Sequence, residues 1–114
     1  MRRQKEDMVY KVGFYGIALE EYFGVIEYLS QFYAGTVRKF FDEFEKCRLI
    51  LAENPYTYQV YESVPAYRRA IVGDYLVFYK VFDPADNQQG VVEIHRILRG
   101  TCDIKRYIDS EDTQ

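Results

Sequence analysis

The hydrophobic period changes near the middle of this 114-residue chain, from a helical spacing to a strand spacing. Between residues 18 and 51 apolar side chains recur at steps of three and four, which is typical of amphipathic helices. After residue 66 the apolar segments are short, rich in β-branched and aromatic residues, and separated by turn signals, which is typical of strands. This change of period predicts an α+β fold.

Two helices are predicted in the first half. The first runs through ALEEYFGVIEYLSQFY, Ala34-Gly35 breaks it, and Thr36 can cap the second. Asn54-Pro55 ends the second helix, because a residue before proline is disfavoured in helical geometry. The short joint implies an antiparallel hairpin. The residues expected to face the core are Ala18, Tyr22, Val25, Ile26, Leu29, Phe32 and Tyr33, then Val37, Phe40, Phe41, Phe44, Cys47 and Leu51. Glu20, Glu21, Glu27 and Gln31 are expected on the wet side.

Four strands are predicted around this hairpin. MVYKVGFY (8–15) precedes the helices, and YRRAIV, YLVFYKVF and VVEIHRIL follow them. Gly73-Asp74 is a hairpin turn signal, and DPADNQQG is a longer loop. The order β-α-α-β-β-β predicts a small, mainly antiparallel sheet with the helical hairpin packed on one face. The opposite face is then exposed unless a partner covers it.

Length and composition predict a single domain over residues 1–114, with flexible ends at 1–7 and 109–114. YTYQVYESVP is interpreted as a partly extended connector and TCDIKRYI as a short helix. No apolar run approaches 18 residues and no signal-peptide core appears, so a cytoplasmic protein without a membrane partner is expected.

The charge of the chain argues against a general nucleic-acid binder, because the formal charge is −3 and the pI is about 5.2. Residues 67–106, however, carry seven Lys or Arg against five Asp or Glu. This weakly basic segment fits a local anionic partner.

Strand alternation assigns side chains to the two faces of the sheet. On the last strand, Val92, Ile94 and Leu98 share a core-directed face with Arg96, which is expected to pair with an acid or to reach an edge. The residues expected on the uncovered face are Glu93, His95, Ile97 and Arg99. On the preceding strand, Leu76, Phe78, Lys80 and Phe82 oppose Tyr75, Val77, Tyr79 and Val81, so both faces are expected to be partly covered.

Candidate chemistry rests on a few cations and one histidine. Arg68 and Arg69 point to opposite faces, and one of them could join Lys80 and Arg99 in a cationic patch for phosphate or carboxylate groups. Ordinary solvated charges are the competing interpretation. His95 could act as a general acid or base, or as a structural histidine. With one histidine and no spaced Cys, Asp or Glu cluster, neither a metal site nor a cofactor is expected, and Cys47 is interpreted as core.

Several blocks of the chain resemble the RelE/ParE superfamily, the toxins of bacterial type II toxin–antitoxin pairs. The resemblance covers Met8 to Ile108 and is carried by AENP, YRRAIVGDYLVFYKV and VVEIHRILRGTCDI. The last block is closer to the ParE branch, which usually reads Leu-His-Gly-x-Arg-Asp. Here it reads Leu98-Arg99-Gly100-Thr101-Cys102-Asp103, so Arg99 and Cys102 replace the histidine and the arginine of the family.

The resemblance implies a plasmid-stabilisation type of toxin that inhibits growth by binding a target such as DNA gyrase. It also implies a cognate antitoxin as partner, in a possible homodimer or heterotetramer. Contacts to the target or antitoxin are expected at Arg68, Arg69, Tyr75, Tyr79, Lys80, His95, Arg99 and Asp103.

Two alternatives remain open. One is a RelE-like, metal-independent endoribonuclease that cuts messenger RNA on the ribosome. Leu76 stands where that branch carries an arginine, and the catalytic candidates would be Lys80, His95, Arg99 and Tyr107. The other is a degenerate, non-toxic member that acts as an interaction module.

Overall fold

The structure is a computed structural model that describes residues 9–104 and 106–108. Its elements follow the predicted β-α-α-β-β-β order, with a short 3-10 turn after the second helix. They are β1 (Tyr10–Phe14), α2 (Ala18–Leu29), α3 (Ala34–Glu53), η1 (Pro55–Thr57), β2 (Arg68–Val72), β3 (Tyr75–Phe82) and β4 (Gly90–Arg99). Met8 and the ends predicted to be flexible, 1–7 and 109–114, lie outside the described residues.

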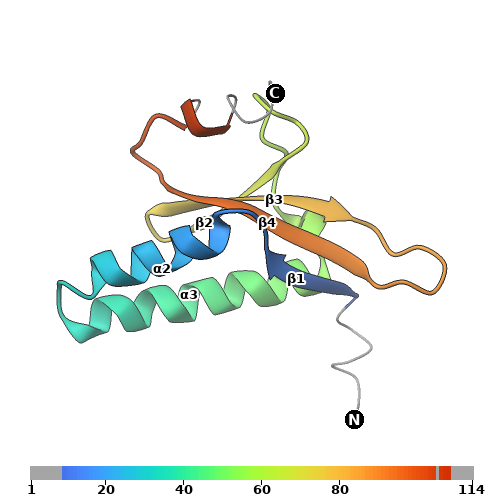
Figure 1. Ribbon diagram of the computed structural model, residues 1–114. Helices are drawn as coiled ribbons and strands as arrows, with labels where there is room; N and C mark the ends of the chain where they lie inside the picture. The colour runs from blue at the N-terminus through green and yellow to red at the C-terminus, as the bar shows by residue number, and fades with distance from the viewer. Residues whose placement is uncertain (1–8, 105, 109–114) are drawn as a thin grey trace, which may run out of the picture.

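The strands form one four-stranded sheet in the order β1-β4-β3-β2. The pairings of β2 with β3 and of β3 with β4 are antiparallel, whereas β1 runs parallel to β4. The turn between β2 and β3 is the predicted Gly73-Asp74 pair, and Gly73 has a positive φ of 61° that glycine adopts without steric cost. The α2–α3 hairpin lies on one face of this sheet, as predicted (Figure 1).

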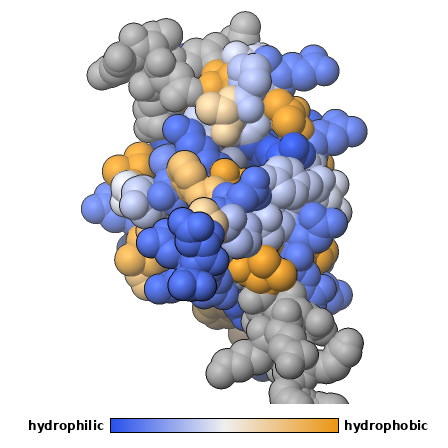
Figure 2. Space-filling model, turned by 90° about the vertical axis from the view of Figure 1, so that its right-hand side faces the viewer, coloured by the Kyte–Doolittle hydropathy of each residue, from blue (hydrophilic) through white to orange (hydrophobic). Residues whose placement is uncertain are grey.

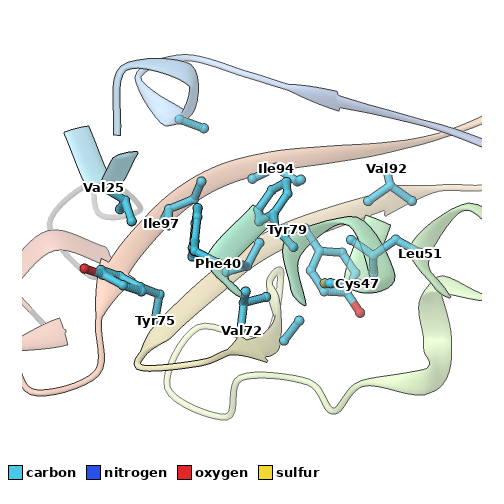
Figure 3. Close-up of a cluster of buried hydrophobic side chains, with 14 residues drawn as sticks. Val25, Phe40, Cys47, Leu51, Val72, Tyr75, Tyr79, Val92, Ile94 and Ile97 are labelled. Carbon is cyan, nitrogen blue, oxygen red and sulfur yellow. The ribbon is translucent and has the colours of Figure 1, made fainter. Parts of the chain in front are cut away.

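The main core fills the space between the helix hairpin and the sheet. Val25, Phe40 and Leu51 from the helices meet Val72, Tyr79 and Ile94 from the strands (Figure 3). Cys47 is part of this core, as predicted, and burial raises the pKa of its thiol to about 11. Among the described residues, no helix has the length and apolar character needed to cross a bilayer.

The joint between the helices differs from the prediction. α2 ends at Leu29, and the hydroxyl of Ser30 donates to the carbonyl of Glu27 at 2.8 Å, a local bond that competes with helix continuation. Phe32 and Tyr33 therefore lie in the joint and are 54% and 78% exposed. α3 begins at Ala34, so Thr36 does not cap it and lies within its first turn. Phe41, also predicted to be inward, is exposed as well.

The opposite face of the sheet is covered in part by the chain itself, as the alternation of β3 predicted, so the expectation that this face is exposed unless a partner covers it is wrong. The segment between η1 and β2 and the helical turn after β4 lie above the sheet in Figure 1. They bring Val64, Tyr67 and Ile108 onto Phe78 and Leu98 in a second buried cluster. The predicted tyrosine connector and the helical turn after β4 therefore cover this part of the sheet face opposite the helices.

A carboxylate joins three separate segments at one end of the sheet. The hydroxyls of Tyr10 in β1 and Tyr56 in η1 both donate to Oδ1 of Asp83, which follows β3. Both bonds lower the pKa of Asp83, and the bond from Tyr56 has the larger effect. Figure 2 shows this end of the molecule, where hydrophobic residues form separate patches among hydrophilic ones.

Gly90 and Gly24 offer a matched pair of alanine substitutions. A Cβ at Gly90 would lie 2.6 Å from the ring of Tyr10 and 3.0 Å from the carbonyl oxygen of Phe82, whereas a Cβ at Gly24 in α2 meets nothing within 4 Å. We expect Gly90→Ala to lower the free energy of unfolding by about 1–3 kcal/mol through overpacking. Gly24→Ala should raise it by about 0.5–1 kcal/mol through helix propensity. Urea denaturation checks both, and equal stability of the two variants would contradict the packing at Gly90.

The tie at Asp83 predicts a pH effect with a defined sign. Because the folded-state pKa of Asp83 is lowered, its contribution to stability is present above the ordinary carboxyl range and is lost as pH falls through the lowered pKa. In Tyr56→Phe one donor is removed, so the pKa of Asp83 should rise toward its ordinary value, its contribution to stability should become smaller, and the loss of that contribution should be complete at a higher pH. NMR titration of the Asp83 carboxyl measures this shift. An unchanged titration would contradict the bond to Tyr56.

Candidate functional site

A bulge in β4 decides which side chains reach each face of the sheet. Phe78 pairs with Arg96 and the next residue, Tyr79, pairs with Ile94, so His95 has no partner in β3. An extra residue in one strand reverses the alternation beyond it. The predicted alternation of VVEIHRIL is therefore correct before the bulge and wrong after it.

Because of the bulge, the residues of β4 after His95 lie on the opposite faces from those predicted. Ile97 faces the helices together with Val92 and Ile94, in the main core (Figure 3). Leu98 packs in the second cluster on the opposite face, and Arg96 lies across from Phe78 of that cluster.

Glu21 of α2 binds the part of β4 that extends past the end of β1 and is paired only with β3. β1 ends at Phe14, and beyond it the carboxylate Oε1 of Glu21 accepts the backbone N–H of Ile97 at 2.7 Å. Oε2 of Glu21 accepts from Nη2 and Nε of Arg96 at 2.7 and 3.0 Å. The prediction that Arg96 pairs with an acid is thus confirmed, and the prediction of Glu21 on the wet side is wrong.

Arg96 also holds the helical turn after β4. Its Nη1 donates to the carbonyl oxygen of Tyr107 at 3.2 Å, and its guanidinium lies 5.4 Å from the centre of the Tyr107 ring. Tyr107 therefore contacts Arg96, an arginine whose charge is already neutralised by Glu21. Arg96 is 5% exposed and Glu21 is partly exposed, so the arginine side of this ion pair is buried.

The open half of the face opposite the helices carries a polar cluster that borders the buried ring of Tyr67. We call it the His95 cluster: Tyr15, Tyr67, Lys80, Glu93 and His95. Nε2 of His95 lies 2.9 Å from Oε1 of Glu93, in a partly buried pair. The imidazole stacks on the ring of Tyr15 at 5.5 Å and meets the edge of Tyr67 at 5.6 Å between centroids. Nζ of Lys80 lies 5.0 Å from the centre of the Tyr67 ring, and Lys80 is the cross-strand neighbour of Glu93.

The His95 cluster combines an imidazole, a carboxylate, an ammonium and two rings at one place. Glu93 can orient the imidazole, and Lys80 can attract an anionic group. The positive charge of Lys80 and the negative charge of Glu93 offset each other, however, so the cluster is a mixed polar surface rather than a strongly cationic pocket. Such a surface suits recognition by hydrogen bonds and ring contacts.

Two of the predicted arginines, Arg68 and Arg99, lie away from this cluster. Arg99 extends toward the helix side, with its guanidinium 5.3 Å from the centre of the Tyr28 ring, and the hydrogen bond with Tyr28 raises its pKa. Its expected place on the uncovered face is therefore wrong. Arg68 donates to the carbonyl of Tyr58 at 2.6 Å and lies over the ring of Tyr56.

Arg69 is the predicted arginine that shares a face with Lys80. It pairs with Phe78, whereas Arg68 pairs with Tyr79, so the prediction that the two arginines point to opposite faces is confirmed. The register places Arg69 diagonally from Lys80, within reach of long side chains. Arg69 lies on β2, at the edge of the sheet.

The remaining predicted contacts are distributed over other parts of the molecule. Tyr79 is fully buried and donates its hydroxyl to the carbonyl of Pro55 at 2.6 Å, so it offers no surface to a partner. Burial raises its pKa well above the ordinary tyrosine value. Tyr75 lies in the core beside Phe40, and Asp103 is exposed at the start of the turn after β4.

Three residues of this region were not singled out from the sequence. Glu21 has the helical position of an exposed acid, and no local signal distinguishes it from Glu20. Tyr15 lies just after β1, and its contact with His95 depends on the parallel pairing of β1 with β4. Tyr67 was treated as the start of a strand, although its place opposite Lys80 follows from the register of β2 and β3.

Among the described residues, no group of three or more His, Cys, Asp or Glu side chains is arranged to hold a metal ion. The fold and the site together define a small α+β protein with a mixed polar surface on the sheet face opposite the helices.

Comparison with known proteins identifies the class. Residues 16–104 match the model of the family described as the ParE toxin of type II toxin–antitoxin system, parDE. A search of curated proteins gave no match. The chain therefore belongs to the RelE/ParE toxin family of type II toxin–antitoxin systems, as the sequence resemblance predicted. The matched range begins at Gly16, so it excludes β1 and also Tyr15, which contributes a ring to the His95 cluster.

Removing the Glu21 carboxylate should destabilise the fold, because Arg96 would lose its counter-ion in a buried position. We expect Glu21→Ala to lower the free energy of unfolding by about 2–4 kcal/mol, toward the lower end of the range for buried pairs because Glu21 keeps some exposure. Glu20→Ala, at the exposed neighbouring position, should change it by less than about 0.5 kcal/mol. Urea denaturation compares the two.

A double-mutant cycle tests the same pair more strictly. Glu21→Ala combined with Arg96→Met should cost less than the sum of the single changes, because no unpaired charge remains. Additive losses would contradict the ion pair.

Proposed function

We propose that this chain is the toxin of a type II pair and inhibits growth by binding a target protein such as DNA gyrase, without catalysing a reaction. One observation carries the proposal, namely the dispersal of the cations. Arg96 is neutralised by Glu21, Arg68 is bonded to Tyr58, and Arg99 lies on the helix side. Stabilising a developing phosphorane charge requires cations that converge on one point.

The surface left open supports a binding function. The His95 cluster offers rings, an imidazole and opposite charges within one partly exposed area, and such groups are common at recognition surfaces. A cognate antitoxin is the partner that the family implies. A cytoplasmic location, which this target requires, and an assembly of antitoxin and toxin as a heterotetramer or with a toxin homodimer, are part of the proposal.

A second candidate function is a metal-independent endoribonuclease acting on ribosome-bound messenger RNA. It is favoured by the 2.9 Å contact of His95 with Glu93, an arrangement suited to proton transfer, next to Lys80. It is opposed by Leu76, which lies in the second buried cluster where the RelE branch carries an arginine.

Induced expression in a bacterial host, with measurement of growth, transcripts and DNA-damage response, separates these readings. The proposal predicts growth arrest with intact transcripts and an SOS-type response. Lys80→Glu, which reverses a charge in the His95 cluster, should weaken target binding by at least about tenfold and so raise the number of surviving colonies. Lys39→Glu, an exposed change on α3, should leave it intact.

The other outcomes are equally distinct. Transcripts cut at ribosomal A-site codons, with loss of cutting in His95→Asn, would establish the endoribonuclease instead. Absence of any arrest from a well-folded chain would contradict both and support a degenerate interaction module.

A further inference from the structure

The first strand, β1, lies at one edge of the sheet, with β4 on its inner side (Figure 1). The N–H of Tyr15 donates to the carbonyl of Ile94 at 2.8 Å, so the backbone of Tyr15 points toward β4. Alternate residues of a strand present their backbone groups to the same side, so the even-numbered residues of β1 point outward, namely Tyr10, Val12 and Phe14. In the part of the chain that the structure describes, no backbone hydrogen bond reaches them from that side.

The sequence of β1 matches itself in one antiparallel register. When two copies meet around a two-fold axis at Val12, Tyr10 lies opposite Phe14 and Lys11 lies opposite Gly13. The outward residues then form hydrogen-bonded pairs, in which both N–H···O bonds are exchanged. An axis at Lys11 would place two lysines directly opposite each other, which is destabilising. A lysine on an edge strand commonly prevents pairing between copies, but here the glycine opposite it leaves room for its side chain.

The same register covers two exposed apolar residues at the ends of β1. Val9 is 41% exposed and Tyr15 is 53% exposed, and an axis at Val12 places Val9 of one copy opposite Tyr15 of the other. Tyr15 stacks on His95, so it lies on the face that carries the His95 cluster, and Val9 shares that face by alternation. An apolar contact at each end of the strand therefore accompanies the backbone bonds.

Gly13 leaves a passage from the second copy to the His95 cluster. Gly13 is the neighbour of Glu93 in the β1–β4 register, and a Cβ at Gly13 would meet nothing within 4 Å. Lys11 of a second copy would lie in line with both, about 9.5 Å from Glu93 between Cα atoms, which is two strand spacings. The flexible four-carbon stem of lysine can bridge this distance above a residue without a side chain. Its ammonium would then meet the carboxylate that contacts His95.

We propose that this chain forms a two-fold homodimer through β1, with Val12 at the axis, so that one sheet runs through both copies and Lys11 of each copy completes the His95 cluster of the other. The proposal deepens the homodimer named in the proposed function, and it rests on that function only for the role of the His95 cluster. A second copy is the occupant that fits, because the backbone bonds, the Lys11–Gly13 match and the Val9–Tyr15 contact all arise from one symmetric register.

A lysine introduced at Gly13 tests the interface without disturbing the single copy. In the monomer Gly13→Lys has free space and lies beside Glu93, whereas in the dimer it lies directly opposite Lys11. We expect it to weaken dimerisation by at least about tenfold. Gly24→Lys in α2, where a Cβ also meets nothing within 4 Å, makes the same change of charge and should leave the dimer intact. Sedimentation equilibrium of the full-length chain over about a hundredfold range of concentration measures both.

A double-mutant cycle tests the contact with the His95 cluster. Lys11→Met and Glu93→Gln should each weaken the dimer by about threefold or more, because the exposed pair occurs twice in a symmetric dimer. Together they should cost little more than one of them alone. Additive losses would overturn the contact between Lys11 and Glu93.

Amide hydrogen exchange identifies the strand and its register. As the concentration of the chain rises, exchange of the Val12 and Phe14 amides should slow, whereas the Lys11 and Gly13 amides, which point toward β4, should not change. A chain that sediments as a monomer throughout, or a dimer that Gly13→Lys leaves unaffected, would overturn the proposal. Slow exchange at Val12 in a monomer would mean that another part of the same chain occupies this edge, and it would overturn the proposal as well.

These outcomes are separate from the growth assay. Arrest by a chain that is monomeric would overturn the dimer and leave the toxin function in place. A dimer through β1 in a chain that causes no arrest would support the interface and contradict the toxin function.

Discussion

The rest of the molecule is organised around the carboxylate of Glu21, which binds β4 on the side where β1 has ended. One carboxylate satisfies the N–H of Ile97, which would otherwise face an open edge, and neutralises the buried Arg96. Arg96 in turn binds the carbonyl of Tyr107, so α2, β4 and the C-terminal turn meet at one ion pair. A buried arginine is costly unless it is paired and hydrogen-bonded, which is why these contacts occur together.

The same ion pair bears on the proposed function, because it neutralises Arg96, which lies across from Phe78 in the sheet. What remains open is the His95 cluster, with a lysine and a glutamate side by side and an imidazole between two rings. A face of this composition suits recognition by shape and hydrogen bonds more than by net charge. This agrees with a chain whose formal charge is −3.

Much of the fold could be predicted from the sequence, because it depends on local signals. Asn54-Pro55 ended a helix, Gly73-Asp74 formed the hairpin, and the period of the apolar residues separated helices from strands. The errors arose where a contact between residues far apart in the sequence determines the structure. The bulge at His95 leaves no mark in VVEIHRIL, so Ile97 and Arg99 were assigned to the wrong face.

The candidate site was predictable to the same limited extent. Glu93 and His95, two residues apart on one strand, were correctly expected to share a face, and Arg68 and Arg69 were correctly expected to diverge. Glu21 and Tyr15 were missed, because each reaches β4 only through the packing of another element. The cover over Phe78 was missed because Ile108 and Val64 meet there from separate parts of the chain.

The central claim is that the open half of the sheet face around His95 contacts the target. Amide hydrogen exchange of the purified chain, with and without purified DNA gyrase, tests it most directly. The account predicts slowed exchange in β4 from Val91 to Arg96 and near Lys80, with α2 and α3 unchanged. Slowed exchange confined to the two helices, with β4 unaffected, would contradict it.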